Sequence, residues 1–155
     1  MKLATLCYVQ QQNLTLMMQR NANKDDIHFG KWNGLGGKLE QHESPEECVI
    51  REVKEESGLN IIQPKLAGIL TFPKFAKHED WYAFVFTANN FNGNLEINSN
   101  EGTLEWIETD KILKLNLWEG DKIFLPWVFK GDFFSAKFEY ENNKLIKHSV
   151  SFYKI

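Results

Sequence analysis

A chain of 155 residues with 43% hydrophobic and 25% charged side chains can bury a core, and its length favours a single domain spanning residues 1–155. The formal net charge is −3 and no basic stripe is present, so a nucleic-acid partner is not expected. No apolar run approaches the roughly 18 residues of a membrane span, and the N-terminus lacks a signal-peptide pattern. Cys7 and Cys48 lie far apart, as buried free thiols of a reducing compartment would. We therefore expect a cytoplasmic protein without a membrane partner.

Alternating and continuous apolar runs predict strands in both halves of the chain. The strands are expected at residues 3–9, 14–19, 61–72, 81–88, 104–107, 133–140 and 144–153. The first two strands and the last two should each form a hairpin. Polar loops or turns are expected at residues 21–30, 89–93 and 98–102, and a glycine-dense segment at 31–39.

Helical signals occur at three places between these strands. The clearest helix runs from about residue 45 to residue 57, a short one covers 109–113, and a second long one covers 122–129. Asp121 is placed to cap this last helix, and Pro126 is expected to kink it. The order of strands and helices predicts a mixed α/β or α+β sandwich.

The helix at 45–57 has a start and a stop signal of its own. Ser44 and Glu47 form a Ser-x-x-Glu capping box, Pro45 suits the first helical position, and Gly58 suits a left-handed end. On this helix Val49 and Val53 share one face, with Ile50 beside them, and we expect these side chains to enter the core.

Three carboxylates on the same helix carry the functional signal. Glu52, Glu55 and Glu56 are spaced i, i+3 and i+4, which places them on one helical face. Such bunched anions repel one another unless a hard divalent cation neutralises them, and oxygen ligands favour Mg²⁺ or Mn²⁺. Arg51 is one turn from Glu55 and is expected to brace it with a bidentate contact. A solvated acidic face is the alternative interpretation of the same pattern.

The segment from Gly37 to Leu59 resembles the Nudix box, G-x5-E-x7-R-E-U-x-E-E-x-G-U, in which U is a bulky aliphatic residue. The chain matches every fixed position of this pattern, with Gly37, Glu43, Arg51, Glu52, Val53, Glu55, Glu56, Gly58 and Leu59.

The resemblance implies an α/β/α sandwich around a mixed sheet and an enzyme that hydrolyses a nucleoside diphosphate linked to another group. It implies that Glu52, Glu55, Glu56 and the Gly37 carbonyl bind Mg²⁺ or Mn²⁺, with Glu52 or Glu56 also as the base. Arg51 and Glu43 would support these ligands. Family members supply one more carboxylate from a loop, and Glu101 is placed to do so here, although a simple loop glutamate fits equally.

Beyond the box, residues 31–38, 118–121 and 133–138 resemble the corresponding segments of MutT- and MutX-type 8-oxo-dGTP diphosphatases, and the resemblance covers nearly the whole chain. The similarity implies a purine nucleoside triphosphate as the small-molecule partner, cleaved to a monophosphate and pyrophosphate by a monomer or homodimer. Phe72, Trp81 and Trp118 would offer aromatic faces to the base, with core packing as the alternative role of each. Asn33 and Asp121 would offer hydrogen bonds to the edge of the base. The expected substrate-binding residues are Arg20, Asn33, Lys38, Phe72, Trp81, Trp118 and Asp121.

One departure from this pattern concerns the base. Mammalian enzymes of this activity use two adjacent aspartates after the tryptophan, whereas here the first of these positions is Gly120. Other substrates therefore stay open, among them ADP-ribose, a dinucleoside polyphosphate and a capped RNA end. A non-catalytic nucleotide sensor of the same fold is a further alternative, although it would not need to keep every carboxylate of the box.

Overall fold

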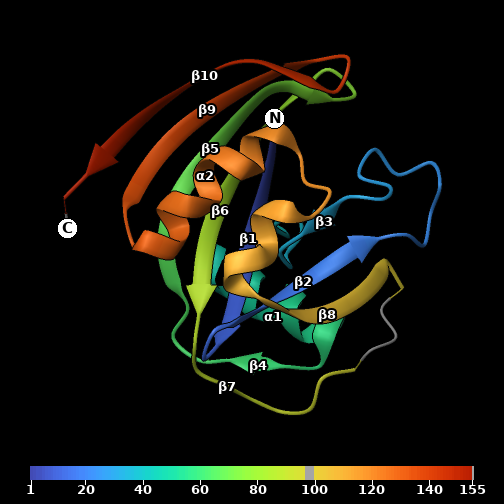
Figure 1. The fold of residues 1–155 in the computed structure, drawn as a ribbon, viewed down its shortest axis with the longest axis vertical. Helices are drawn as coiled ribbons and strands as arrows, with labels where there is room; N and C mark the ends of the chain where they lie inside the picture. Colours follow the sequence, from blue (N-terminus) through green and yellow to red (C-terminus); the bar gives the residue numbers. More distant parts are fainter. Residues whose placement is uncertain (97–99, 155) are drawn as a thin grey trace.

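An eight-stranded mixed sheet forms the centre of the computed structural model, which describes residues 1–96 and 100–154 (Figure 1). Its strands are β1 (Lys2–Gln11), β2 (Leu14–Arg20), β3 (Trp32–Asn33), β5 (Lys65–Ala76), β6 (Glu79–Ala88), β8 (Gly102–Glu108), β9 (Phe133–Glu141) and β10 (Lys144–Tyr153). The order is β10-β9-β5-β6-β1-β2-β3, and β8 pairs with β2. The pairs β1–β6 and β5–β9 are parallel and the others are antiparallel. A separate small sheet joins β4 (Asn60–Ile61) to β7 (Phe91–Asn92).

Both predicted hairpins are present, but β1 and β2 separate soon after their turn. They share only the pairs Gln10↔Thr15 and Gln11↔Leu14, after which β2 continues against β8 and β3. The edge of β1 that β2 leaves open is taken by the glycine-dense segment, through bridges of Cys7 to Leu35 and of Ala4 to Lys38. This separation therefore places the start of the Nudix-like box in the middle of the sheet.

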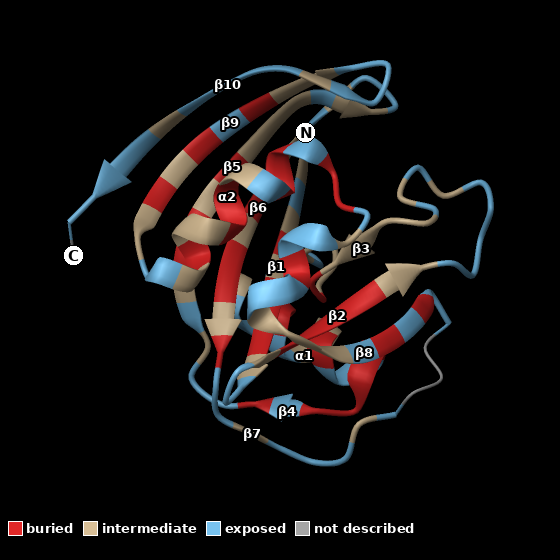
Figure 2. Ribbon diagram, viewed as in Figure 1, coloured by how far each residue is buried: buried red, intermediate tan, exposed pale blue. Residues whose placement is uncertain are grey.

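The two long helices, α1 (Pro45–Ser57) and α2 (Glu119–Lys130), cover opposite faces of the sheet. Side chains alternate between faces along a strand. Accordingly Cys7 of β1 packs in one core cluster with Val49 and Val53 of α1, whereas Tyr8 packs in the other with Phe124 of α2. Figure 2 shows the buried residues concentrated in the central strands and in the helix faces turned toward them. The predicted mixed α/β sandwich is confirmed.

Three details of the prediction are wrong. The strand expected at 61–72 is divided, because the chain turns at Gln63 (φ 49°) and Pro64 before β5 begins. Ile50 is 38% exposed and does not enter the core with its neighbours. Asp121 does not cap α2, because the helix begins at Glu119.

The shorter elements agree with the pattern. A 3₁₀ helix, η1 (Thr109–Lys114), occupies the position of the short helix, and α2 continues to Lys130 with Pro126 inside it. The turn expected at 98–102 lies partly outside the described residues, since the description resumes at residue 100. No helix within the described ranges is long and apolar enough to cross a membrane.

Candidate active site

A cavity of about 830 Å³ opens beside β1, β2 and the glycine-dense segment, within the size range of small-molecule sites. One end, called here the acidic end, contains Glu52, Glu56 and Glu101. The other, called the aromatic end, is formed by Phe72, Phe75, Trp118 and Tyr140, with Asn33 and Asp121. All seven predicted substrate-binding residues line this cavity, and three of the four predicted carboxylates do.

Local signals hold α1 in place at the acidic end. The Ser44 hydroxyl accepts from the Glu47 backbone N–H (3.1 Å), and the Glu47 carboxylate accepts from the Ser44 backbone N–H (2.8 Å), which confirms the capping box. Gly58 ends the helix with φ 81°. The backbone before α1 also approaches it closely, because a side chain on Gly37 would overlap the Glu52 carboxylate. The glycines of the box therefore permit this close approach.

The carboxylates at the acidic end are held in a partly dry environment. Glu56 is only 8% exposed, and its carboxylate accepts from the Gly36 N–H at 2.8 Å. Burial, and then the hydrogen bond and charge of Glu101, hold the pKa of Glu56 well above its usual range. Burial also raises the pKa of Glu52, against the opposing effect of Arg51. Without a cation, the Glu56–Glu101 pair therefore retains a proton.

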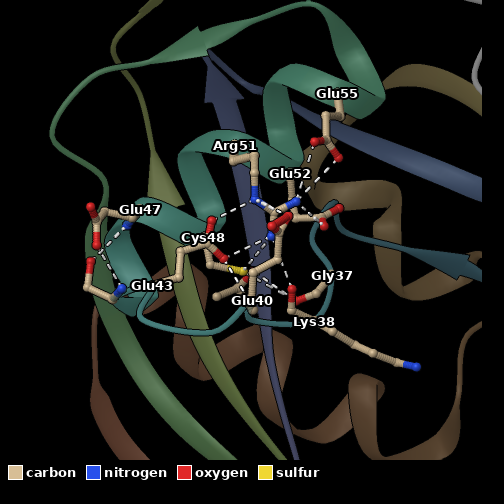
Figure 3. Close-up of polar contacts among 11 residues, drawn as sticks. Gly37, Lys38, Glu40, Glu43, Glu47, Cys48, Arg51, Glu52 and Glu55 are labelled. Carbon is tan, nitrogen blue, oxygen red and sulfur yellow. Dashed lines mark hydrogen bonds and ion pairs between the residues drawn. The ribbon is translucent and has the colours of Figure 1, made fainter.

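Arg51 organises the outer side of this cluster (Figure 3). Its guanidinium makes a bidentate contact with Glu43, at 2.6 and 2.9 Å, and donates to Glu52 at 2.7 Å. The hydrogen bonds from Arg51, and then that from the Glu40 backbone N–H, lower the pKa of Glu43 to about 2. The contact expected with Glu55 is present, since Arg51 Nη1 lies 3.4 Å from both Glu55 oxygens, but the shorter two-nitrogen contact is with Glu43. Arg51 thus fixes the orientation of Glu52 and lies outside the cavity lining.

Two predicted ligands differ in placement from Glu52 and Glu56. The Glu55 side chain is 58% exposed and does not line the cavity, so the three carboxylates of α1 do not share one environment. The Gly37 carbonyl accepts from the Thr5 N–H (2.8 Å), the Thr5 hydroxyl (3.3 Å) and the Cys48 thiol (3.6 Å). Gly37 also lines the cavity, and a cation bound to its carbonyl would compete with these donors, so its role as a ligand stays a prediction.

The donor set at the acidic end nevertheless fits a hard divalent cation. Glu52, Glu56 and Glu101 offer only oxygen atoms, and because burial and then Glu101 raise the pKa of Glu56, a bound cation would favour its charged form. Among the described residues, no three His, Cys, Asp or Glu side chains are already grouped closely enough to hold a metal ion. Side-chain rotation at these glutamates would therefore accompany binding.

Two cationic side chains also line the cavity, Arg20 and Lys38. Arg20 pairs with Asp26 at 2.8 Å, so its charge is balanced before any phosphate arrives. Lys38 places its ammonium 5.4 Å from the centre of the Trp81 ring, a cation–π contact. Both residues line the cavity, as predicted.

The aromatic end is a layer of rings in edge-to-face contact. Trp118 lies 5.1 Å from Phe75 and 5.3 Å from Tyr140, centre to centre, and donates from its indole nitrogen to His28 Nδ1 at 2.8 Å. Burial, then Arg20, lower the pKa of His28 to about 4, so the ring is neutral and accepts this bond. His28, Phe75 and Tyr140 were not predicted, because they lie in a loop or at strand ends where only the abundance of aromatic residues hinted at a pocket.

Two buried polar side chains, Asn33 and Asp121, line the aromatic end. The Asn33 Nδ2 atom is buried and has no hydrogen-bond partner in the described part of the chain. Asp121 is 7% exposed, and burial raises its pKa to about 7, with Lys31 opposing the shift. Buried polar groups without partners are costly, so their presence in a cavity indicates a ligand that satisfies them.

Comparison with known proteins gives consistent matches over most of the chain. A model of the NUDIX domain family matches residues 2–128. The uncharacterised Nudix hydrolase YvcI of Bacillus subtilis is 35% identical over 130 residues, which are 82% of this chain and 78% of that protein. An oxidized purine nucleoside triphosphate hydrolase of Danio rerio is 30% identical over 145 residues, or 94% and 90%. The crystal structure of a MutT protein from Bacillus halodurans superposes with a TM-score of 0.85 and 29% identity, covering 97% of each chain.

Proposed function

Because this chain belongs to the Nudix hydrolase family, we propose that it hydrolyses oxidised purine nucleoside triphosphates, such as 8-oxo-dGTP, to the monophosphate and pyrophosphate. The observation that carries the proposal is one cavity that joins a carboxylate cluster to an aromatic layer with the unpaired amide of Asn33. A nucleotide needs both, at opposite ends of one extended ligand. Similarity to the Danio rerio hydrolase and to the Bacillus halodurans MutT protein supports the substrate class.

At the acidic end, Glu52, Glu56 and Glu101 would hold Mg²⁺ or Mn²⁺. A divalent cation bound there neutralises charge on the phosphate oxygens during attack by water. Glu52 or Glu56 takes the proton of the attacking water, and the Gly36 N–H keeps the Glu56 carboxylate in position. Arg51 holds Glu52 in its rotamer through the contact at 2.7 Å. Glu55, exposed at the rim, joins the ligand set only if its side chain turns inward.

At the aromatic end, Trp118 and Phe72 offer faces or edges to the base, and Asn33 and Asp121 offer hydrogen bonds to its rim. Lys38 and Arg20 line the same cavity and would contact the phosphates. For Arg20 this requires the carboxylate of Asp26 to share or release it. The substrate therefore spans from stacked base to hydrolysed phosphate along one cavity.

A substrate panel with product identification tests the proposal. Steady-state kinetics with Mg²⁺ should give the highest kcat/KM for 8-oxo-dGTP or 2-hydroxy-dATP and a lower one for dGTP, with a monophosphate and pyrophosphate as products. ADP-ribose, a dinucleoside polyphosphate and capped RNA serve as the competing substrates. Faster turnover of any of these three, or equal turnover of oxidised and normal triphosphates, would refute the proposed substrate.

A further inference from the structure

The hydroxyl of Tyr140 occupies the position beside α2 where Gly120 leaves space. Gly120 is the second residue of α2, and its N–H donates to the Tyr140 hydroxyl oxygen at 2.7 Å. The first N–H groups of a helix have no partner within it, so this bond satisfies one of them. A Cβ atom on Gly120 would lie 2.7 Å from that oxygen and 2.9 Å from the Phe138 ring. Tyr140 in its observed position therefore requires glycine at residue 120.

Because of this hydrogen bond, the Tyr140 hydroxyl can act toward a ligand only as a hydrogen-bond donor. Its oxygen already accepts from Gly120, whereas its own proton is not used in that bond. Burial raises the pKa of Tyr140 well above its usual range, so the hydroxyl keeps its proton at neutral pH. Ring contacts with Trp118 (5.3 Å) and Phe75 (5.4 Å) hold the side chain at the cavity wall. The result is a fixed, neutral donor at the aromatic end.

We propose that the Tyr140 hydroxyl is a specificity-determining hydrogen-bond donor that selects purines with a carbonyl at the 6-position over purines with an amino group there. This inference rests on the proposed function, since it assigns the base preference of the same cavity. A carbonyl at the 6-position accepts a hydrogen bond from the Tyr140 hydroxyl. An amino group at the same position would direct its own hydrogens toward that hydroxyl and could not accept the bond. The mismatched base would leave a buried donor unsatisfied, and an enzyme rejects such a substrate more strongly than it rejects a small change of shape.

Asp121 supplies the complementary contact. Its carboxylate is close enough to Tyr140 for its charge to raise the pKa of that hydroxyl. An ionised carboxylate accepts from ring and exocyclic N–H groups, which a guanine-type edge carries next to its carbonyl. One donor from Tyr140 and acceptors from Asp121 match that edge. Gly120 has no side chain to contact the base, but the Tyr140 hydroxyl from β9 supplies a polar group in its place.

The test compares Tyr140→Phe with the wild-type enzyme on two substrates that differ at the 6-position, 8-oxo-dGTP and 8-oxo-dATP. The ratio of their kcat/KM values should fall about 10-fold in the variant, through loss of the 6-carbonyl substrate, as expected for one neutral hydrogen bond. Tyr153→Phe, an exposed tyrosine on β10 outside the cavity, is the matched control and should leave the ratio unchanged. Gly120→Ala, which displaces the hydroxyl without removing it, should lower the ratio in the same direction.

A binding measurement separates this inference from the proposed function. Quenching of tryptophan fluorescence by 8-oxo-dGMP and 8-oxo-dAMP, without divalent metal, reports base preference even if no triphosphate is hydrolysed. A wild-type preference for 8-oxo-dGMP that Tyr140→Phe abolishes would support the inference whether or not the hydrolysis occurs. An unchanged ratio in Tyr140→Phe, or an equal loss for both bases, would overturn it and leave the hydrolase proposal standing.

Discussion

Replacing Glu56 by glutamine should make the enzyme less active and, without metal, more stable. Glutamine keeps the size of the side chain and an oxygen that can accept from the Gly36 N–H, but it removes the negative charge. If Glu56 is a metal ligand or the base, kcat should fall by about 10²- to 10⁴-fold. The stability gain follows because folding must either bury the Glu56 charge or protonate the side chain, and glutamine requires neither.

The size of that gain follows from the burial of Glu56, which is 8% exposed. Burying an ion costs several kcal/mol even after relaxation, and Glu56 avoids part of this cost by retaining its proton. A net gain of about 2 kcal/mol at pH 8 corresponds to a rise of about 4–8 °C in Tm for a domain of this size. Since the pKa of Glu56 in the folded protein is raised above its ordinary value of 4.5, the cost is absent below that pH and grows as pH rises.

Thermal unfolding in EDTA between pH 5 and pH 8, together with steady-state kinetics in Mg²⁺, measures both effects. Glu55→Gln is the matched control, because it makes the same substitution one residue earlier at a side chain that is 58% exposed. Its Tm should change little. A Glu56→Gln variant with near-normal kcat, or with a Tm below wild type at pH 8 without metal, would refute the reasoning.

Three further outcomes are expected. The pKa of Asp121 in the folded protein is raised from 3.8 to about 7, so its contribution to the free energy of unfolding is complete below about pH 4 and lost by about pH 7. Urea unfolding of wild type should therefore show a loss of up to about 4 kcal/mol over this range, and Asp121→Asn should not. An identical pH profile in both proteins would contradict the assignment. Gly36→Ala should lower the free energy of unfolding by about 3 kcal/mol or more, measured by urea titration, because the added methyl would overlap the Thr5 carbonyl; a neutral effect would show that β1 can move away. Mg²⁺ should restore activity after EDTA treatment and raise the Tm of wild type but not of Glu56→Gln; an equal rise in both would place the cation elsewhere.

The base pocket could be predicted only in part. Trp118, Asn33 and Asp121 were found through resemblance, and all three line the cavity. Tyr140 was missed because it ends a strand with ordinary alternation, and nothing near it in the sequence marks it as facing Gly120. Asp121 was also given the wrong structural role, since an acidic residue before an apolar run resembles a helix cap even when it lies inside the first turn.

Local chemistry explains what the sequence by itself determined. The helix from Pro45 to Ser57 was predicted to the residue, because its capping box, proline and terminal glycine act within a few residues of one another. The bunched carboxylates, and hence the family and a divalent cation as the cofactor expected, follow from the same short segment. The order of the predicted strands and helices likewise sufficed for the mixed sandwich.

Only the tertiary structure decided which of those carboxylates share one environment. The Gly36 N–H donates a hydrogen bond to the buried Glu56 carboxylate, and the chain before β8 places Glu101 beside it. Glu55 stays exposed. Arg51 contacts Glu43 more closely than Glu55 because the chain before α1 folds back beside it. Helical spacing limits which side chains share a face, whereas burial and pKa depend on segments distant in sequence that pack against that face, and these become known only when the sheet is assembled.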